Sequence, residues 1–105
     1  MLVLPNKSSV IWDRFLKENQ VLVYKYIVRE IKKNLATEVD PIELFKFEDD
    51  SMHAYVPRNK LLTTLHSAMK VFINHEEYEY AGKTNTIIKS YYINKLIKDS
   101  TKLKE

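Results

Sequence analysis

Residues 58–97, RNKLLTTLHSAMKVFINHEEYEYAGKTNTIIKSYYINKLI, decide the fold that this chain is expected to adopt. Apolar residues recur at helical spacing on both sides of a polar joint near Asn74 and His75, and this periodicity predicts two helices. A short joint closes two such helices as an antiparallel pair. The predicted inward face of the first helix comprises Leu61, Leu62, Leu65, Ala68, Met69, Phe72 and Ile73. The predicted inward row of the second comprises Tyr78, Ala81, Asn85, Ile88 and Tyr92, with Ile87, Tyr91 and Leu96 beside it.

Gly82 is the only glycine in the chain. Inside a helix a glycine costs roughly 1 kcal/mol relative to alanine, and its lack of a side chain lets two backbones approach closely. We therefore predict the tightest contact of the hairpin at Ala81 and Gly82, against Met69 or Phe72. The alternative is that Gly82 ends or bends the second helix.

A pattern of leucine, methionine, lysine, tyrosine and alanine positions runs through both predicted helices. It comprises Leu61, Leu65, Met69, Lys70, Tyr78, Glu79, Ala81, Gly82, Lys83, Ile88 and Lys89. This pattern resembles the UVR motif, a helical hairpin of bacterial excision-repair nuclease subunits and of regulators and adaptors of Clp-type proteases. The resemblance covers a little over a third of the chain and implies a non-catalytic contact module that pairs with itself or with a second copy on another protein. We expect structural roles in the hairpin for Leu61, Leu65, Met69, Phe72, Tyr78, Ala81, Gly82 and Ile88.

Residues 8–36 are predicted to form one long helix that begins at Ser8 or Ser9 and bends near Asn19. Residues 21–28 are rich in valine, tyrosine and isoleucine and also fit a strand. We favour the helix because a strand there would leave residues 29–35 without a role. Residues 1–7 are expected to be a short lead with a turn at Pro5.

Residues 42–57 are predicted to form a small β-hairpin, with strands near 43–47 and 52–56 around an acidic turn at Asp49, Asp50 and Ser51. A two-stranded ribbon alone is marginal in water, so one face should lie on the helices. The alternative is an irregular loop with aromatic anchors. The chain as a whole is thus expected to be a single α+β domain, residues 1–105, that is predominantly α, with a helical hairpin at 58–98 and a frayed basic tail at 99–105.

Composition limits the classes of function. The chain has no cysteine, and its apolar runs are too short to span a bilayer, so we expect a soluble, cytoplasmic protein without a membrane partner. His53, His66 and His75 lack metal-ligand spacing. The acidic pairs Asp49–Asp50 and Glu76–Glu77 have no accompanying nucleophile. We therefore expect no enzyme activity, no metal and no cofactor.

The favoured function is a protein–protein adaptor that forms a homodimer and binds a protein partner of unknown identity. The chain has seven tyrosines and one tryptophan, residue types that are enriched at interfaces. Its brevity and its lysine- and asparagine-rich composition resemble those of an accessory protein of a phage or mobile element that acts on a host protein. The expected partner-binding residues are Tyr55, Glu76, Glu77, Glu79, Tyr80, Tyr91 and Tyr92.

The alternative function is a small basic helical protein that contacts the backbone of DNA or RNA. The chain carries a formal net charge of +3, and lysines alternate with tyrosines near its C-terminus. The residues of this alternative are Lys25, Arg29, Lys32, Lys33, Lys89, Lys95 and Lys98. We favour the adaptor because the chain has only three arginines, the residue type that most often reads bases.

Overall fold

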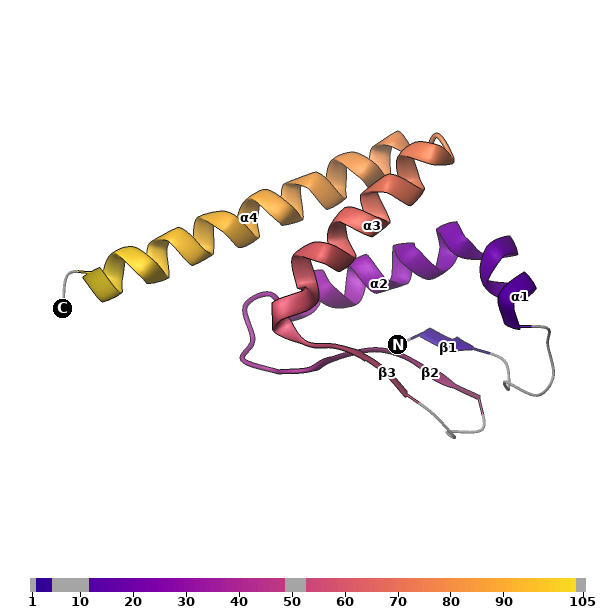
Figure 1. The fold of residues 1–105 in the computed structure, drawn as a ribbon, viewed down its shortest axis with the longest axis horizontal. Coiled ribbons are helices and arrows are strands. Elements are labelled where there is room, and N and C mark those ends of the chain that lie inside the picture. The colour runs from indigo at the N-terminus through magenta and orange to yellow at the C-terminus, as the bar shows by residue number, and fades with distance from the viewer. Residues whose placement is uncertain (1, 5–11, 49–52, 104–105) are drawn as a thin grey trace.

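The computed structural model describes residues 2–4, 12–48 and 53–103, and it is an α+β fold made mostly of helices. In the sheet, the central strand is β2 (Ile42–Phe47), which lies between β1 (Leu2–Leu4) and β3 (His53–Val56). Helices α1 (Trp12–Glu18) and α2 (Gln20–Asn34) lie beside the sheet, and a 3-10 turn, η1 (Arg58–Lys60), leads into α3 (Leu61–Asn74). Helix α3 packs on α2, and the long helix α4 (Tyr78–Leu103) packs on α3 and extends well past it (Figure 1). The predicted fold class is confirmed.

The core is one cluster that joins the sheet to α2, α3 and α4. Ile31 of α2, Ile42 of β2 and Leu61, Leu65 and Phe72 of α3 are completely buried. Burying a large apolar side chain stabilises the fold by about 1.5–3 kcal/mol, so these five positions contribute most to holding the layers together.

The long N-terminal helix predicted over residues 8–36 is found as two helices, α1 and α2, which are separated at Asn19, where a bend was predicted, and end at Asn34. The backbone N–H and the side-chain Nδ2 of Asn19 both donate to the carbonyl of Phe15, at 3.0 and 2.9 Å. Because Val23 N–H still donates to the Asn19 carbonyl, α2 starts directly after this break. Residues 21–28 are helical rather than extended, since Val23, Ile27 and Ile31 then share one buried face. The expected helix start at Ser8 or Ser9 lies outside the described residues.

The expectation of a lead at the N-terminus is wrong for residues 2–4, which form strand β1. This strand pairs in parallel with β2, with Leu4 opposite Phe47, and Leu4 is only 3% exposed. Three residues carry too short a pattern to predict a strand. Their partner is β2, some forty residues further along the chain, so the pairing depends on the crossover through α1 and α2.

The β-hairpin is confirmed, with strands at Ile42–Phe47 and His53–Val56 in antiparallel register. Ile42, Leu44 and Val56 are buried against the helices, as a ribbon with one covered face requires. The register is irregular between Glu43 and Phe45. The predicted turn at Asp49, Asp50 and Ser51 lies outside the described residues.

The C-terminal helical hairpin is also confirmed, and its joint is a Schellman turn. The Glu77 N–H donates to the Phe72 carbonyl at 2.7 Å, and the Glu76 N–H donates to the Ile73 carbonyl at 3.1 Å. Glu76 adopts a positive φ of 59°, a conformation that glycine adopts more easily. The joint is therefore where predicted, but no glycine makes it.

Two structural roles predicted within the hairpin are wrong. Tyr78 is 64% exposed, and a Cβ built on Gly82 would meet no atom within 4 Å, so neither residue packs against α3. The buried face of α4 is instead formed by Ala81, Thr84, Ile87 and Ile88. Thr84 can be buried because its hydroxyl donates to the Tyr80 carbonyl at 2.8 Å.

The predicted frayed tail is wrong for residues 99–103, which continue α4 to Leu103. No proline or glycine occurs between Lys83 and Leu103, so nothing in the local sequence ends the helix. As a result the C-terminal half of α4 projects as a rod (Figure 1).

Candidate functional site

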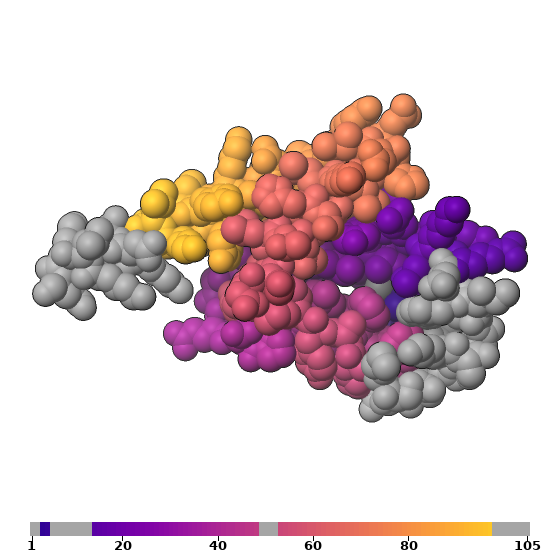
Figure 2. Space-filling view, viewed as in Figure 1, coloured from indigo at the N-terminus to yellow at the C-terminus, as the bar shows by residue number. Residues whose placement is uncertain are grey.

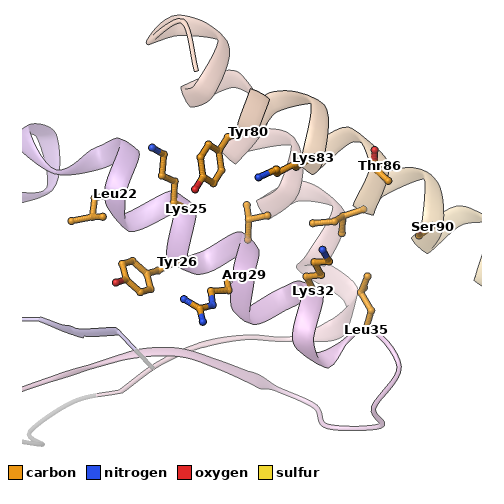
Figure 3. Close-up of a pocket in the computed structure, with 12 residues that line it drawn as sticks. Leu22, Lys25, Tyr26, Arg29, Lys32, Leu35, Tyr80, Lys83, Thr86 and Ser90 are labelled. Carbon is orange, nitrogen blue, oxygen red and sulfur yellow. The ribbon is translucent and has the colours of Figure 1, made fainter. Parts of the chain in front are cut away.

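A groove of about 540 Å³ lies between α2 and α4. Both helices pack on α3, and the groove opens along the side where they face each other (Figure 3). Its lining combines apolar side chains with cations and tyrosines. The lining residues are Leu22, Lys25, Tyr26, Val28, Arg29, Lys32 and Leu35 from the α2 side and Tyr80, Lys83, Thr86, Ile87 and Ser90 from α4.

Tyr80 closes one end of the groove. The Nζ atoms of Lys25 and Lys83 lie 4.3 and 5.0 Å from the centre of its ring, at distances typical of cation–π contacts. The ring also packs against Phe72, with centroids 5.7 Å apart. Figure 3 shows Lys25 reaching from α2 toward the Tyr80 ring. Tyr80 is therefore a fixed, half-buried wall and not a free surface ring.

Two of the four cations in the groove already have acidic partners. Lys25 Nζ lies 3.5 Å from Glu77 Oε1, and Lys83 Nζ lies 3.4 Å from Glu79 Oε1. Arg29 and the fourth cation, Lys32, are both exposed, and no aspartate or glutamate is among the described residues that line the groove. The end of the groove near Arg29 is therefore positively charged.

A second unusual surface is the outer face of α4, which points away from α3 and from the groove. Tyr78, Tyr92, Ile93 and Leu96 are 64%, 48%, 56% and 66% exposed. Gly82 lies on the same face with open space around it. In Figure 2 the coloured part of α4 extends past α3 toward one side of the molecule. Tyr92, Ile93 and Leu96 are neighbours on this face, and Gly82, Asn85 and Lys89 separate them from Tyr78. A group of exposed apolar side chains marks an interaction site.

The open space at Gly82 leads to a stability prediction. Gly82→Ala should raise the free energy of unfolding by about 0.5–1 kcal/mol, because alanine favours the helix and meets no obstacle. The matched variant Ala81→Gly should lower it by about 1 kcal/mol or more, since Ala81 is buried. Urea unfolding followed by circular dichroism at low protein concentration measures both. A destabilising Gly82→Ala would mean that Gly82 is confined by contacts within its own chain.

The structure distributes the expected partner-binding residues over several surfaces. Tyr80 lies in the groove, where Lys25 and Lys83 contact its ring. Tyr55 is exposed on β3 and stacked on His53, with ring centroids 6.3 Å apart. Tyr92 is on the outer face of α4, while Tyr91 is half-buried against the core. The remaining three, Glu76, Glu77 and Glu79, lie at or just after the joint before α4.

The residues of the nucleic-acid alternative divide in the same way. Lys25, Arg29 and Lys32 line the groove. Lys33 lies outside it, with its Nζ 3.8 Å from Glu30 Oε1. Exposed positions on α4 away from the groove are held by Lys89 and Lys95, and the side chain of Lys98 lies outside the described part.

Sequence analysis did not predict that Leu22, Tyr26 and Lys83 line a common groove. Leu22, Lys25, Tyr26, Arg29 and Lys32 do form a visible stripe at helical spacing on α2. That stripe carries no sign of which helix lies beside it, so the groove needed the tertiary structure.

The candidate chemical groups lie apart from both surfaces. The Nδ1 atom of His53 is hydrogen-bonded to the Glu43 carboxylate across β2 and β3, and His66 and His75 are exposed. Among the described residues no three histidine, aspartate or glutamate side chains are grouped so that they could hold a metal ion. None of the described helices is both long enough and apolar enough to cross a membrane.

Comparisons of the chain with protein-family models, with curated proteins and with solved structures found no match. The groove and the outer face of α4 are therefore the observations on which a function has to rest.

Proposed function

We propose that the protein is a non-catalytic adaptor that forms a homodimer through the outer face of α4. The observation that carries this proposal is the exposure of Tyr78, Tyr92, Ile93 and Leu96, each 48–66% accessible, on one face of a projecting helix. Exposed apolar side chains grouped in this way lower solubility unless a partner covers them. A second helix is the natural cover, because residues spaced by three and four form a single seam.

The spacing of the outer face favours a second copy of α4 in antiparallel orientation. Positions 78, 82, 85, 89, 92 and 96 are separated alternately by four and three residues, as in a heptad seam. When two copies are centred between Asn85 and Lys89, Gly82 lies opposite Tyr92 of the second copy. In the same register Tyr78 lies opposite Leu96. Gly82, the smallest residue of the seam, thus leaves space for the Tyr92 ring of the second copy. This packing would offset the cost of a glycine inside the helix.

Charge favours the same orientation. Glu79 lies in the first turn of α4, with Glu76 just before the helix, and Lys95 lies in its C-terminal half. Antiparallel pairing places the acidic end of one copy beside the basic half of the other, and it also opposes the two helix dipoles. Parallel pairing would place lysine beside lysine and glutamate beside glutamate.

The wider setting of the adaptor is part of the proposal. The resemblance of residues 58–97 to the UVR motif supports a contact module, and the absence of cysteine suits the cytoplasm. An accessory protein of a phage or mobile element that acts on a host protein remains the setting that the composition favours.

A second candidate function is binding to the backbone of a nucleic acid. The clustering of Lys25, Arg29 and Lys32 with Lys83 in one groove supports it, since backbone binding needs grouped cations. The exposed apolar face of α4 has no role in this alternative.

Sedimentation velocity over a range of protein concentrations tests the dimer. The wild type should sediment as a dimer at micromolar concentrations. Leu96→Glu should raise the dimer dissociation constant at least tenfold, because it places a charge in the seam. A tenfold change corresponds to about 1.4 kcal/mol, which is less than the value of one buried leucine.

The matched control is Ile73→Glu. Ile73 is 47% exposed on α3, away from the proposed seam, so this variant should leave the dimer unchanged. A wild type that stays monomeric at high micromolar concentration, or equal weakening by both variants, would overturn the dimer.

A further inference from the structure

We propose that the groove between α2 and α4 binds an amphipathic helix of a partner protein, with acidic residues along one edge of that helix. This inference names the partner chemistry of the adaptor proposed above and rests on that function, but it does not depend on the dimer. It follows from the shape, the charge and the wall residues of the groove.

The shape of the groove suits a helix of a few turns. Along α2 the lining runs from Leu22 to Leu35, which at 1.5 Å per residue is about 20 Å. Leu22, which is 51% exposed, and the half-buried Tyr26 give the groove apolar surface, with Val28 and Ile87 buried beneath. The short side chains of Thr86 and Ser90 line the α4 wall, which leaves room for bulky side chains to enter. An apolar groove of this length is the usual receptor for the apolar face of an amphipathic helix.

The charges of the groove define the edge of that helix. Lys25, Arg29 and Lys32 follow one another on α2 at intervals of four and three residues, which is also the spacing of one row on a helix. Arg29 and Lys32 are exposed, and no acid lines the groove among the described residues. Acidic residues three positions apart on a partner helix would meet Arg29 and Lys32. The Arg29 guanidinium can hold a carboxylate through two hydrogen bonds.

The walls of the groove favour a protein ligand over a nucleic acid. Proteins that bind single strands offer aromatic faces on which bases stack. The Tyr80 ring is instead already contacted by two ammonium groups and by Phe72. A phosphate backbone also gains nothing from the exposed apolar side chain of Leu22.

The groove also discriminates against the chain's own projecting helix. Helix α4 carries the exposed residues Lys89 and Lys95, which would meet Arg29 and Lys32 with like charge. A separate, acidic partner therefore fits the groove better than a second copy of this chain.

Fluorescence anisotropy tests the proposal with a labelled amphipathic peptide that has leucines on one face and glutamates along one edge. The wild type should bind this peptide and should not bind the same peptide with lysine in place of glutamate. The double variant R29E/K32E should weaken binding at least tenfold. The control K60E/K70E makes the same change in net charge at exposed positions outside the groove and should change affinity less than twofold.

A second variant keeps the test independent of charge and of folding. Thr86→Trp fills the groove without altering the net charge and should also abolish binding, while circular dichroism reports whether each variant is folded. Leu96→Glu should bind the peptide normally, so that failure of the dimer and failure of the groove are separate results. No binding of the acidic peptide by the wild type, or equal loss in K60E/K70E, would overturn the proposal. Tighter and strongly salt-dependent binding of labelled oligothymidine would assign the groove to nucleic acid instead.

Discussion

Phe72→Ala should lower the free energy of unfolding by about 4 kcal/mol, the largest effect expected of any substitution considered for this chain. Phe72 is completely buried and belongs to the cluster that joins α3 to α2, α4 and the sheet. Its ring also supports Tyr80 at a centroid distance of 5.7 Å. Truncation removes this surface and leaves a cavity that rigid neighbouring helices cannot fill. Urea unfolding followed by circular dichroism measures the change.

The neighbouring residue Ile73 supplies the control. Ile73 is 47% exposed, so Ile73→Ala should cost less than about 1 kcal/mol. Similar losses for both variants would mean that α3 does not present Phe72 to the core, and the hairpin would have to be rotated.

Arg58→Ala should lower the free energy of unfolding by about 2–3 kcal/mol, because this arginine holds the loop between α2 and β2. Its Nε donates to the Val39 carbonyl at 2.8 Å, and its NH2 group donates to the carbonyls of Asn34 and Thr37 at 2.7 and 2.6 Å. A hydrogen bond to a charged group contributes about 1.5–3 kcal/mol to stability. Because Arg58 and its partners are partly exposed, the expected loss lies within this range for the whole set of bonds. The Asn34 carbonyl lies at the C-terminal end of α2, where a cation is also favoured by the helix dipole.

Two further variants test the geometry of this contact. Arg58→Lys keeps the charge but cannot span three carbonyls, so it should recover less than half of the loss. Lys60→Ala, an exposed change in the same 3-10 turn, should change stability by less than about 0.5 kcal/mol. Equal losses of stability for Arg58→Ala and Lys60→Ala in thermal or urea unfolding would show that the hydrogen bonds of Arg58 to the loop do not form.

The elements that could be predicted are those with a long and regular pattern. Leu61, Leu65 and Phe72 recur on one side of α3, and all are buried. Helix α2 was predicted because a strand over residues 21–28 would leave residues 29–35 without a role, in spite of the strand propensity of its valines and tyrosines. Tertiary contacts at the buried row of Val23, Ile27 and Ile31 decide in favour of the helix.

The inward face of α4 could not be predicted by hydrophobicity. Tyr78 and Tyr92 are large and apolar but exposed, whereas Thr84 is polar and completely buried. The Thr84 hydroxyl donates to a carbonyl of its own helix, which lowers the cost of burying it. The tyrosines lie on the outer face of α4. The exposed tyrosines and the buried threonine therefore place the apolar face predicted from the sequence away from the face that is buried in the structure.

The positions of the turn and of the glycine also differ from the usual pattern, in which a glycine forms the turn after a helix. Glu76 takes the positive φ at the joint, where a glycine is the usual residue, and Gly82 lies on an open helical face. Sequence reasoning assumed that the costly glycine serves a contact within the hairpin. The groove was missed for a different reason, because Lys83 and Arg29 come together only when α2 and α4 pack on the same helix.

Cysteine cross-linking gives the most direct test of the proposed pairing of α4 helices, since the chain has no cysteine of its own. The antiparallel register places position 78 opposite position 96 of the second copy, while the two copies of position 96 lie about 27 Å apart along the helices. A disulfide needs Cα atoms within about 7 Å. Mixing Tyr78→Cys with Leu96→Cys under mild oxidation should therefore give a mixed disulfide dimer, with little cross-linking of either variant alone. Efficient cross-linking of Leu96→Cys with itself, or no mixed product, would contradict the account.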